Sequence, residues 1–133
     1  MSKDWVKDIH DMQSKYQTRH WVDKNPEKLK QFLEFRVDFL REELEETEAA
    51  LINMDSEEIV DGLIDLCVIA IGTLDAFGVD PYKAWDEVLR ANMQKEVGVK
   101  PTRPNPLGVP DLTKPDDWEG PSHQGNHGKL NDI

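Results

Sequence analysis

The sequence predicts an all-α protein, an antiparallel bundle of about four helices per chain that is completed by oligomerisation. Apolar residues recur at helical spacing along most of residues 5–97, and no stretch alternates with period two, so no β-sheet is expected. Most of the chain's prolines follow Gly98, where they exclude a long helix. We therefore expect a helical domain over residues 1–98 and an irregular Pro/Gly-rich tail over residues 99–133, packing on that domain or on a neighbouring subunit.

The first two helices are separated by a clear break. The first is predicted from about Trp5 to Trp21, where apolar and aromatic residues recur at helical spacing. The dipeptide Asn25-Pro26 then starts the second helix, because asparagine can cap a helix and proline fits its first position. The second helix is expected to continue to about Met54.

The third and fourth helices follow from similar signals. Asp55 precedes Glu58 by three residues, a variant of the capping-box spacing, and opens the third helix. That helix should end near Phe77, with Gly78 in a left-handed conformation. It is apolar nearly all round, which predicts burial on most sides. Asp80-Pro81 restarts the chain as a fourth helix, which is expected to stop at Gly98.

Charge and composition exclude several classes of partner. The net charge of −11 argues against duplex nucleic acid or an anionic membrane, since both need a positive surface. No apolar run is long enough to span a membrane. The single cysteine, Cys67, permits no internal disulfide, and no signal peptide is evident, so a cytoplasmic setting is expected.

Two charged residues interrupt the apolar face of the second helix. Glu43 falls near the middle of that face with Arg36 beside it, whereas Glu46 lies at its edge, one turn beyond Glu43. A carboxylate on a buried face is costly unless it is paired or binds a metal. From this helix alone, an Arg36–Glu43 ion pair and a functional site are therefore equally good explanations for the charged residues on the apolar face.

The third helix favours the functional site. Glu58, Asp61 and Asp65 share one stripe of an otherwise apolar helix, at spacings of three and four. Three like charges repel one another, and nothing nearby in sequence neutralises them. A divalent cation such as Mg²⁺ would do so, because it takes carboxylate oxygens and bridges to phosphates. Helices packed side by side would bring Glu43 and Glu46 against Glu58 and Asp61.

A known family shares these motifs. The run Arg41–Glu46 (REELEE), followed by Glu58–Asp61 (EIVD), resembles the ExxE…ExxD signature of MazG-like nucleotide pyrophosphohydrolases, in the all-α NTP pyrophosphohydrolase superfamily. Gly78–Asp80 and Arg90–Lys95 (RANMQK) look like that family's glycine-containing turn and its last helix. The resemblance covers roughly residues 26–97, and the tail is similar to that of phage or phage-related members, which implies a host cytoplasm.

The resemblance implies a bundle assembled from two or more subunits and the hydrolysis of (deoxy)nucleoside triphosphates to the monophosphate and pyrophosphate, in dNTP pool control or house-cleaning. It implies that Mg²⁺, or Mn²⁺ as a substitute, is held by four catalytic acids, with Asp65 as a further ligand. Arg36, Asn92 and Lys95 would bind the nucleotide. The four catalytic acids are Glu43, Glu46, Glu58 and Asp61.

Two alternatives remain. An enzyme of the same fold could act on another diphosphate, such as phosphoribosyl-ATP or a guanosine alarmone. A non-enzymatic helical interaction protein would explain the acidic surface, but not the carboxylates on apolar faces. A homodimer or homotetramer is expected in any case, because one short chain cannot cover both the long second helix and the apolar third.

Overall fold

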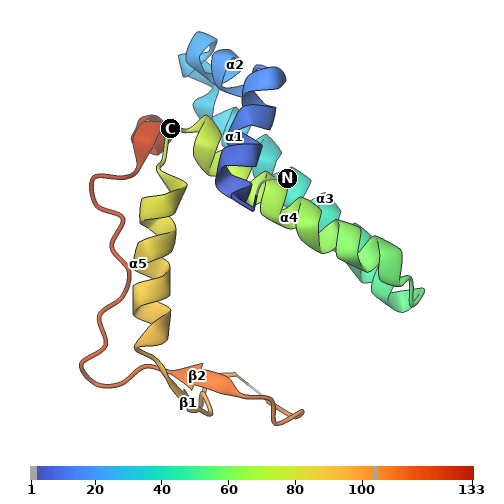
Figure 1. Cartoon of the computed structure of the whole chain (residues 1–133), viewed down its shortest axis with the longest axis vertical. Helices are drawn as coiled ribbons and strands as arrows, with labels where there is room; N and C mark the ends of the chain where they lie inside the picture. Colours follow the sequence, from blue (N-terminus) through green and yellow to red (C-terminus); the bar gives the residue numbers. More distant parts are fainter. Residues whose placement is uncertain (1–2, 104) are drawn as a thin grey trace. The chain divides into compact units, whose positions relative to one another are not determined.

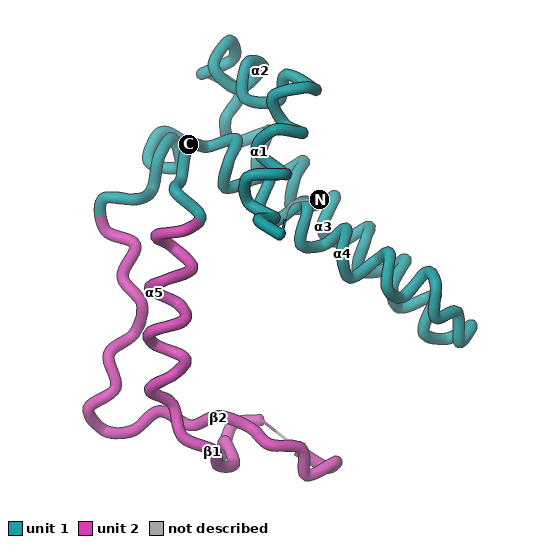
Figure 2. Tube along the Cα trace, viewed as in Figure 1, with its two compact units in different colours: residues 1–81, 125–133 teal, residues 82–124 magenta. Residues whose placement is uncertain are grey.

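The computed structural model describes residues 3–103 and 105–133, so Met1, Ser2 and Pro104 of the predicted ranges lie outside the described residues. The chain is mostly helical, as predicted. It forms two compact units, residues 1–81 with 125–133 and residues 82–124 (Figure 2).

The first unit is built around a helical hairpin. α3 and α4 run side by side in opposite directions, and α1 and α2 pack against α4 (Figure 1). A short 3₁₀ turn, η1, leads from α2 into α3. The bounds are α1 Trp5–Lys15, α2 Thr18–Lys24, η1 Pro26–Lys28, α3 Leu29–Ile52 and α4 Ser56–Ala76.

The single first helix predicted from Trp5 to Trp21 is wrong, because the chain breaks after Lys15. Tyr16 ends α1, and Gln17 adopts a left-handed conformation with a φ of 62° before α2 begins at Thr18. The apolar spacing continues across this break, so the pattern gave no sign of it. The turn lets the chain fold back and pack a second short helix on the hairpin.

The helix boundaries around α3 and α4 follow the sequence signals in part. The expected cap by Asn25 is wrong, because its side-chain amide instead donates to the carbonyl of Trp21 at 2.8 Å. The Asp55 carboxylate accepts from the backbone N–H of Glu58 at 3.2 Å, as predicted. Gly78 has a φ of 74°, the left-handed conformation predicted after α4.

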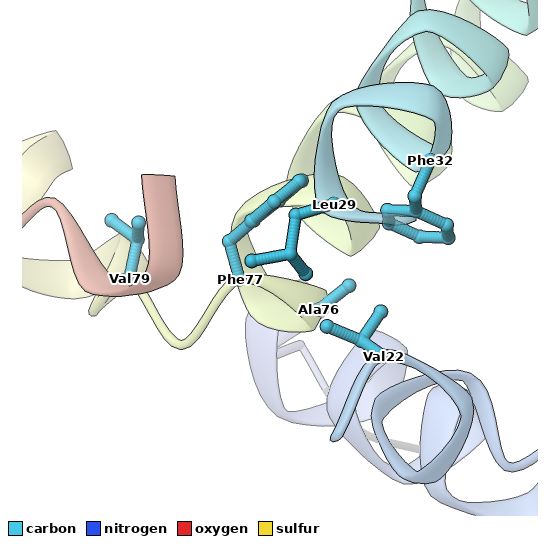
Figure 3. Packing of buried hydrophobic residues seen from close by; sticks show 6 residues of the cluster. All are labelled: Val22, Leu29, Phe32, Ala76, Phe77 and Val79. Atoms are coloured by element: carbon cyan, nitrogen blue, oxygen red, sulfur yellow. The ribbon is translucent and has the colours of Figure 1, made fainter. Parts of the chain in front are cut away.

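The core of the first unit lies where α2, α3 and the end of α4 meet (Figure 3). Phe77 and Val22 are fully buried there. The last described residues close over this cluster: Leu130, in the 3₁₀ turn η2 (Gly128–Asp132), packs against it, and the Lys129 N–H donates to the Phe77 carbonyl at 2.7 Å. The cluster comprises Val22, Leu29, Phe32, Ala76, Phe77 and Val79.

The second unit contains most of α5 (Pro81–Met93) and a small sheet. The expectation of no sheet is wrong, because β1 (Glu96–Gly98) pairs antiparallel with β2 (Asp111–Thr113). A three-residue ladder is too short to leave an alternating pattern in the sequence. The chain enters β1 soon after Met93, so α5 ends before the predicted Gly98.

The sequence predicted that α4 is buried on most sides, but within one chain much of its apolar surface is exposed. Val60 and Leu63 are 64% and 52% exposed, and Ile64 is also exposed. In the described part of the chain the helix is packed mainly by α3, with α1 and α2 covering only part of its length. No single helix among the described residues is long and apolar enough to cross a membrane, and the pair α4 and α5 meets that test only jointly, by length and composition.

Candidate active site

An open pocket of about 340 Å³ in the first unit brings together three of the candidate residues. Arg36 and Glu43 reach it from α3, and Asp65 reaches it from α4. α1 closes one side. The remaining lining residues are mostly apolar: Met12, Gln13, Phe39, Val68 and Ile69.

Helical spacing and one glycine account for this meeting. Arg36, Phe39 and Glu43 follow at spacings of three and four, so they share one face of α3. One turn further, Thr47 faces Gly62 of α4, where any Cβ would collide with the threonine hydroxyl. Gly62 therefore permits a close approach of the two helices beside the acidic residues.

Arg36 is held by hydrogen bonds that leave its charge uncompensated. Its Nε donates to Thr73 Oγ1 at 2.9 Å and its Nη2 donates to the Ile69 carbonyl at 3.0 Å. Its guanidinium lies about 6 Å from the ring centroids of Phe32 and Phe39. Burial lowers the pKa of Arg36, yet a guanidinium keeps its proton in proteins.

The Arg36–Glu43 ion pair that the sequence left open is not formed, and within residues 3–103 and 105–133 no carboxylate pairs with Arg36. The guanidinium faces a pocket that contains Glu43 and Asp65. It is therefore a free cation at the site, available to a phosphate.

Glu43 lies at the centre of the acidic cluster. Burial raises the pKa of its carboxyl, and the negative charges of Glu46, Asp65 and Glu42 raise it further. Carboxylates that repel one another in this way create a demand for a cation, since no ion pair among the described residues involves them.

Three of the predicted acids, Glu46, Glu58 and Asp61, lie outside the pocket. Glu58 and Asp61 are exposed on the first turns of α4, contrary to the expectation that they occupy a buried face. The hairpin explains this: with Gly62 opposite Thr47, residues before Gly62 lie level with the end of α3, which α1 does not cover. The pocket thus pairs Glu43 with Asp65, while Glu58 and Asp61 continue the same stripe of α4 toward the hairpin loop.

The acidic residues suit a divalent cation chemically. Among the described residues, no group of three or more His, Cys, Asp or Glu side chains is placed to hold a metal ion. The predicted ligands are all carboxylates, whose oxygens are the ligands of Mg²⁺ and Mn²⁺, and the charges of Glu46 and Asp65 act on Glu43. The donor chemistry therefore fits such an ion.

The other two candidate residues belong to the second unit. Asn92 is exposed in the last turn of α5. The Lys95 ammonium lies 5.4 Å from the ring centroid of Trp118, whose indole N–H donates to the Ala91 carbonyl at 2.6 Å. The tail thus packs on α5, and its Trp118 contacts Lys95, a residue predicted to bind the substrate.

One pocket residue was missed by the sequence reasoning. Gln13 is buried on α1 and donates from its side-chain amide to the Gly72 carbonyl at 2.9 Å. Its spacing of four from Ile9, on the same buried face, is the signal that could have identified it. It fixes α1 over the pocket.

Replacing Glu43 by glutamine is expected to stabilise the metal-free protein at neutral pH. Because the pKa of Glu43 is raised in the folded protein, its ionised form opposes folding once the pH exceeds the ordinary value of 4.5. In the presence of a chelator, Glu43→Gln should therefore raise Tm at pH 7 but not at pH 4, where the carboxyl is protonated in both states. Equal melting temperatures of variant and wild type at pH 7 would contradict the raised pKa.

Comparison with known proteins gives one match. A family model described as phosphoribosyl-ATP pyrophosphohydrolase matches residues 7–92, well over half of the chain. The matched segment includes most of α1, all of α2 to α4, nearly all of α5 and every candidate site residue except Lys95. Neither the curated proteins nor the solved structures contain a significant match to the chain.

Proposed function

Because the chain belongs to the phosphoribosyl-ATP pyrophosphohydrolase family, we propose that it hydrolyses the bond between the α- and β-phosphates of a nucleoside triphosphate and releases pyrophosphate. The family is part of the MazG-like all-α NTP pyrophosphohydrolase superfamily, so the resemblance seen in the sequence is confirmed. Membership indicates a pyrophosphohydrolase, a hydrolase acting on acid anhydrides. The substrates we propose are (deoxy)nucleoside triphosphates, in dNTP pool control or house-cleaning.

The observation that carries this proposal is the meeting of Glu43 and Asp65 beside an unpaired Arg36 in one pocket. A triphosphate chain needs cationic partners, and Arg36 supplies one. The carboxylates would repel that chain on their own, so the same pocket needs a divalent cation to accept it. A protein that only binds other proteins would not need two carboxylates and an arginine without ion-pair partners in one pocket.

The chain's own residues have separable parts in the proposed reaction. Arg36 binds a phosphate oxygen and orients the triphosphate, while Phe39, Val68 and Ile69 limit the access of bulk water. Glu43 accepts the proton of the attacking water, since it is the carboxylate that the others surround.

A divalent ion would be held by the acids of both helices and would supply charge neutralisation and acidification of a bound water. Superfamily members generally depend on such an ion. Asn92 and Lys95 complete the proposed contacts to the nucleotide. The proposed ligand acids are Glu43, Glu46, Glu58, Asp61 and Asp65.

A second candidate substrate is phosphoribosyl-ATP, which the description of the matched family favours. It is itself a triphosphate, and the same α–β bond would break. The pocket at Arg36 and Glu43 therefore serves both candidates, and the difference between them lies in what surrounds the base.

A substrate screen with pyrophosphate detection tests the proposal. Ribonucleoside and deoxyribonucleoside triphosphates and phosphoribosyl-ATP would be compared by kcat/KM with Mg²⁺, and with excess chelator as control. Pyrophosphate release that requires the metal is expected for at least one of them. A preference of more than about tenfold for phosphoribosyl-ATP would select the second candidate. Absence of pyrophosphate with every substrate would reject both.

We also propose a homodimer, or a homotetramer built from dimers. The hairpin of α3 and α4 exposes a row of apolar side chains that a second copy would cover. Light scattering at micromolar protein should return at least twice the mass of the chain, and a monomer mass would contradict the assembly. The exposed residues include Leu44, Leu51, Val60, Leu63 and Ile64.

A further inference from the structure

A second pocket, of about 540 Å³, lies in the first unit where α1 and α2 meet the start of α3. Its walls are mainly aromatic, and two amide side chains, the Thr18 hydroxyl and the Lys28 ammonium add polar groups to the lining. A pocket of this size that combines apolar walls with a few polar groups is typical of a small-molecule site. The aromatic residues are Tyr16, Trp21, Phe32 and Phe35, and the amides are Gln17 and Gln31.

This aromatic pocket adjoins the acidic one. Phe32 lines the aromatic pocket, and one turn further along α3 the Arg36 guanidinium stands 6.0 Å from its ring centroid while lining the acidic pocket. On the opposite wall, Gln13 of the acidic pocket is one turn from Gln17 of the aromatic pocket. The two pockets therefore lie one after the other, with α3 as one wall of both and the segment from Gln13 to Gln17 as the opposite wall.

The distance between the aromatic pocket and the acidic pocket suits the length of an extended nucleotide. Phe35 and Glu43 are eight residues apart on one straight helix, which places them roughly 12 Å apart along its axis at 1.5 Å per residue. A nucleoside triphosphate with its phosphates at Arg36 and Glu43 would therefore extend its base toward Phe35.

We infer that the aromatic pocket binds the nucleobase of the substrate, an inference that rests on the proposed function. Aromatic side chains stack on any base, and Trp21 and Phe32 already lie 5.7 Å apart between ring centroids. The amides of Gln17 and Gln31 can each donate and accept, so they can read the edge of a base. The aromatic pocket thus determines which nucleotide is bound, and the acidic pocket determines which bond is broken.

The backbone at Gln17 supports a ligand site. Gln17 has a φ of 62°, a left-handed conformation that costs free energy for a residue other than glycine. Its N–H donates to the Ser14 carbonyl at 3.2 Å, and its carbonyl accepts from the Trp21 N–H at 2.9 Å. Strained backbone of this kind is concentrated at ligand sites, and here it turns the chain so that both Gln17 and Trp21 line the pocket.

The test compares two ligands and two variants. The ligands are α,β-methylene-ATP, which cannot be cleaved at the α–β position, and tripolyphosphate, which has no base; both are titrated calorimetrically with Mg²⁺. Phe35→Ala is the pocket variant, because Phe35 is 63% exposed and contributes little to the core. Ile52→Ala is the matched control, since Ile52 is 80% exposed on the same helix and lines neither pocket.

Phe35→Ala is expected to weaken binding of the ATP analogue by roughly tenfold, while tripolyphosphate binding changes by less than about twofold. Ile52→Ala should leave both affinities unchanged. Equal effects of Phe35→Ala on both ligands, no effect on either, or failure of the wild-type protein to bind the analogue would overturn the inference. If the analogue binds as expected but no triphosphate releases pyrophosphate, the proposed reaction fails while the base pocket stands.

Discussion

Replacement of Glu43 by glutamine is expected to lower kcat for pyrophosphate release by at least about 100-fold, as the loss of a major electrostatic contribution does. The substitution keeps the size and hydrogen-bonding shape of the side chain but removes its charge and its ability to accept a proton. Glu43 lies in the same pocket as Arg36, and its carboxyl is the one whose pKa the neighbouring acids raise.

The same loss is expected for amide variants of Glu46, Glu58 and Asp61, and for Asp65→Asn, which removes the partner of Glu43 on α4. Glu45→Gln is the matched control, because Glu45 is exposed on the neighbouring face of α3 and its variant should keep wild-type turnover. Near-wild-type turnover in any two of the five site variants would refute the assignment of the site.

Replacement of Asp75 by alanine is expected to be the most destabilising change among the charged residues. Asp75 is buried near the end of α4, where it accepts from Arg19 Nη1 at 2.6 Å and pairs with His10 Nδ1 at 2.6 Å. These bonds join α1, α2 and α4. Removing the carboxylate leaves a partly buried guanidinium without its partner, which typically costs about 3 kcal/mol.

Denaturant unfolding measures this loss, and Asp11→Ala is its control. Asp11 also forms an ion pair, with Lys7, but both groups are exposed on α1 and solvent screens them. The midpoint should therefore fall clearly for Asp75→Ala and hardly at all for Asp11→Ala. Similar midpoints for the two variants would show that the network at Asp75 does not stabilise the first unit.

Local signals in the sequence predicted the boundaries of α4 but not the cap before α3. The start of α4 at Asp55 and its end before Gly78 depend on neighbouring residues only, and both were predicted. The break at Gln17 was not, because the apolar pattern runs through it and the helix that follows, α2, packs on α4, which is distant in sequence. The ladder of β1 with β2 joins segments well separated in the chain, so its pairing leaves no local pattern.

In the candidate site, too, features within one helix were predicted, whereas features that depend on contacts between helices were not. Helical periodicity placed Arg36 and Glu43 on one face, and the structure brings them to one pocket. Which acids of α4 face Glu43 depends on the register between two helices, and that register is set by the contact of Gly62 with Thr47. Periodicity within a single helix contains no information about this register, so Asp65 was predicted only as a further ligand.

The central claim is that the bond between the α- and β-phosphates breaks, and ³¹P NMR of the reaction in ¹⁸O-labelled water tests it most directly. Water is the expected nucleophile, because the pocket at Glu43 and Asp65 contains no serine, histidine or cysteine. Attack at the α-phosphorus predicts pyrophosphate as the first product, with the label in the nucleoside monophosphate. Early release of orthophosphate, with the nucleoside diphosphate accumulating, would contradict it and indicate cleavage of the terminal phosphate instead.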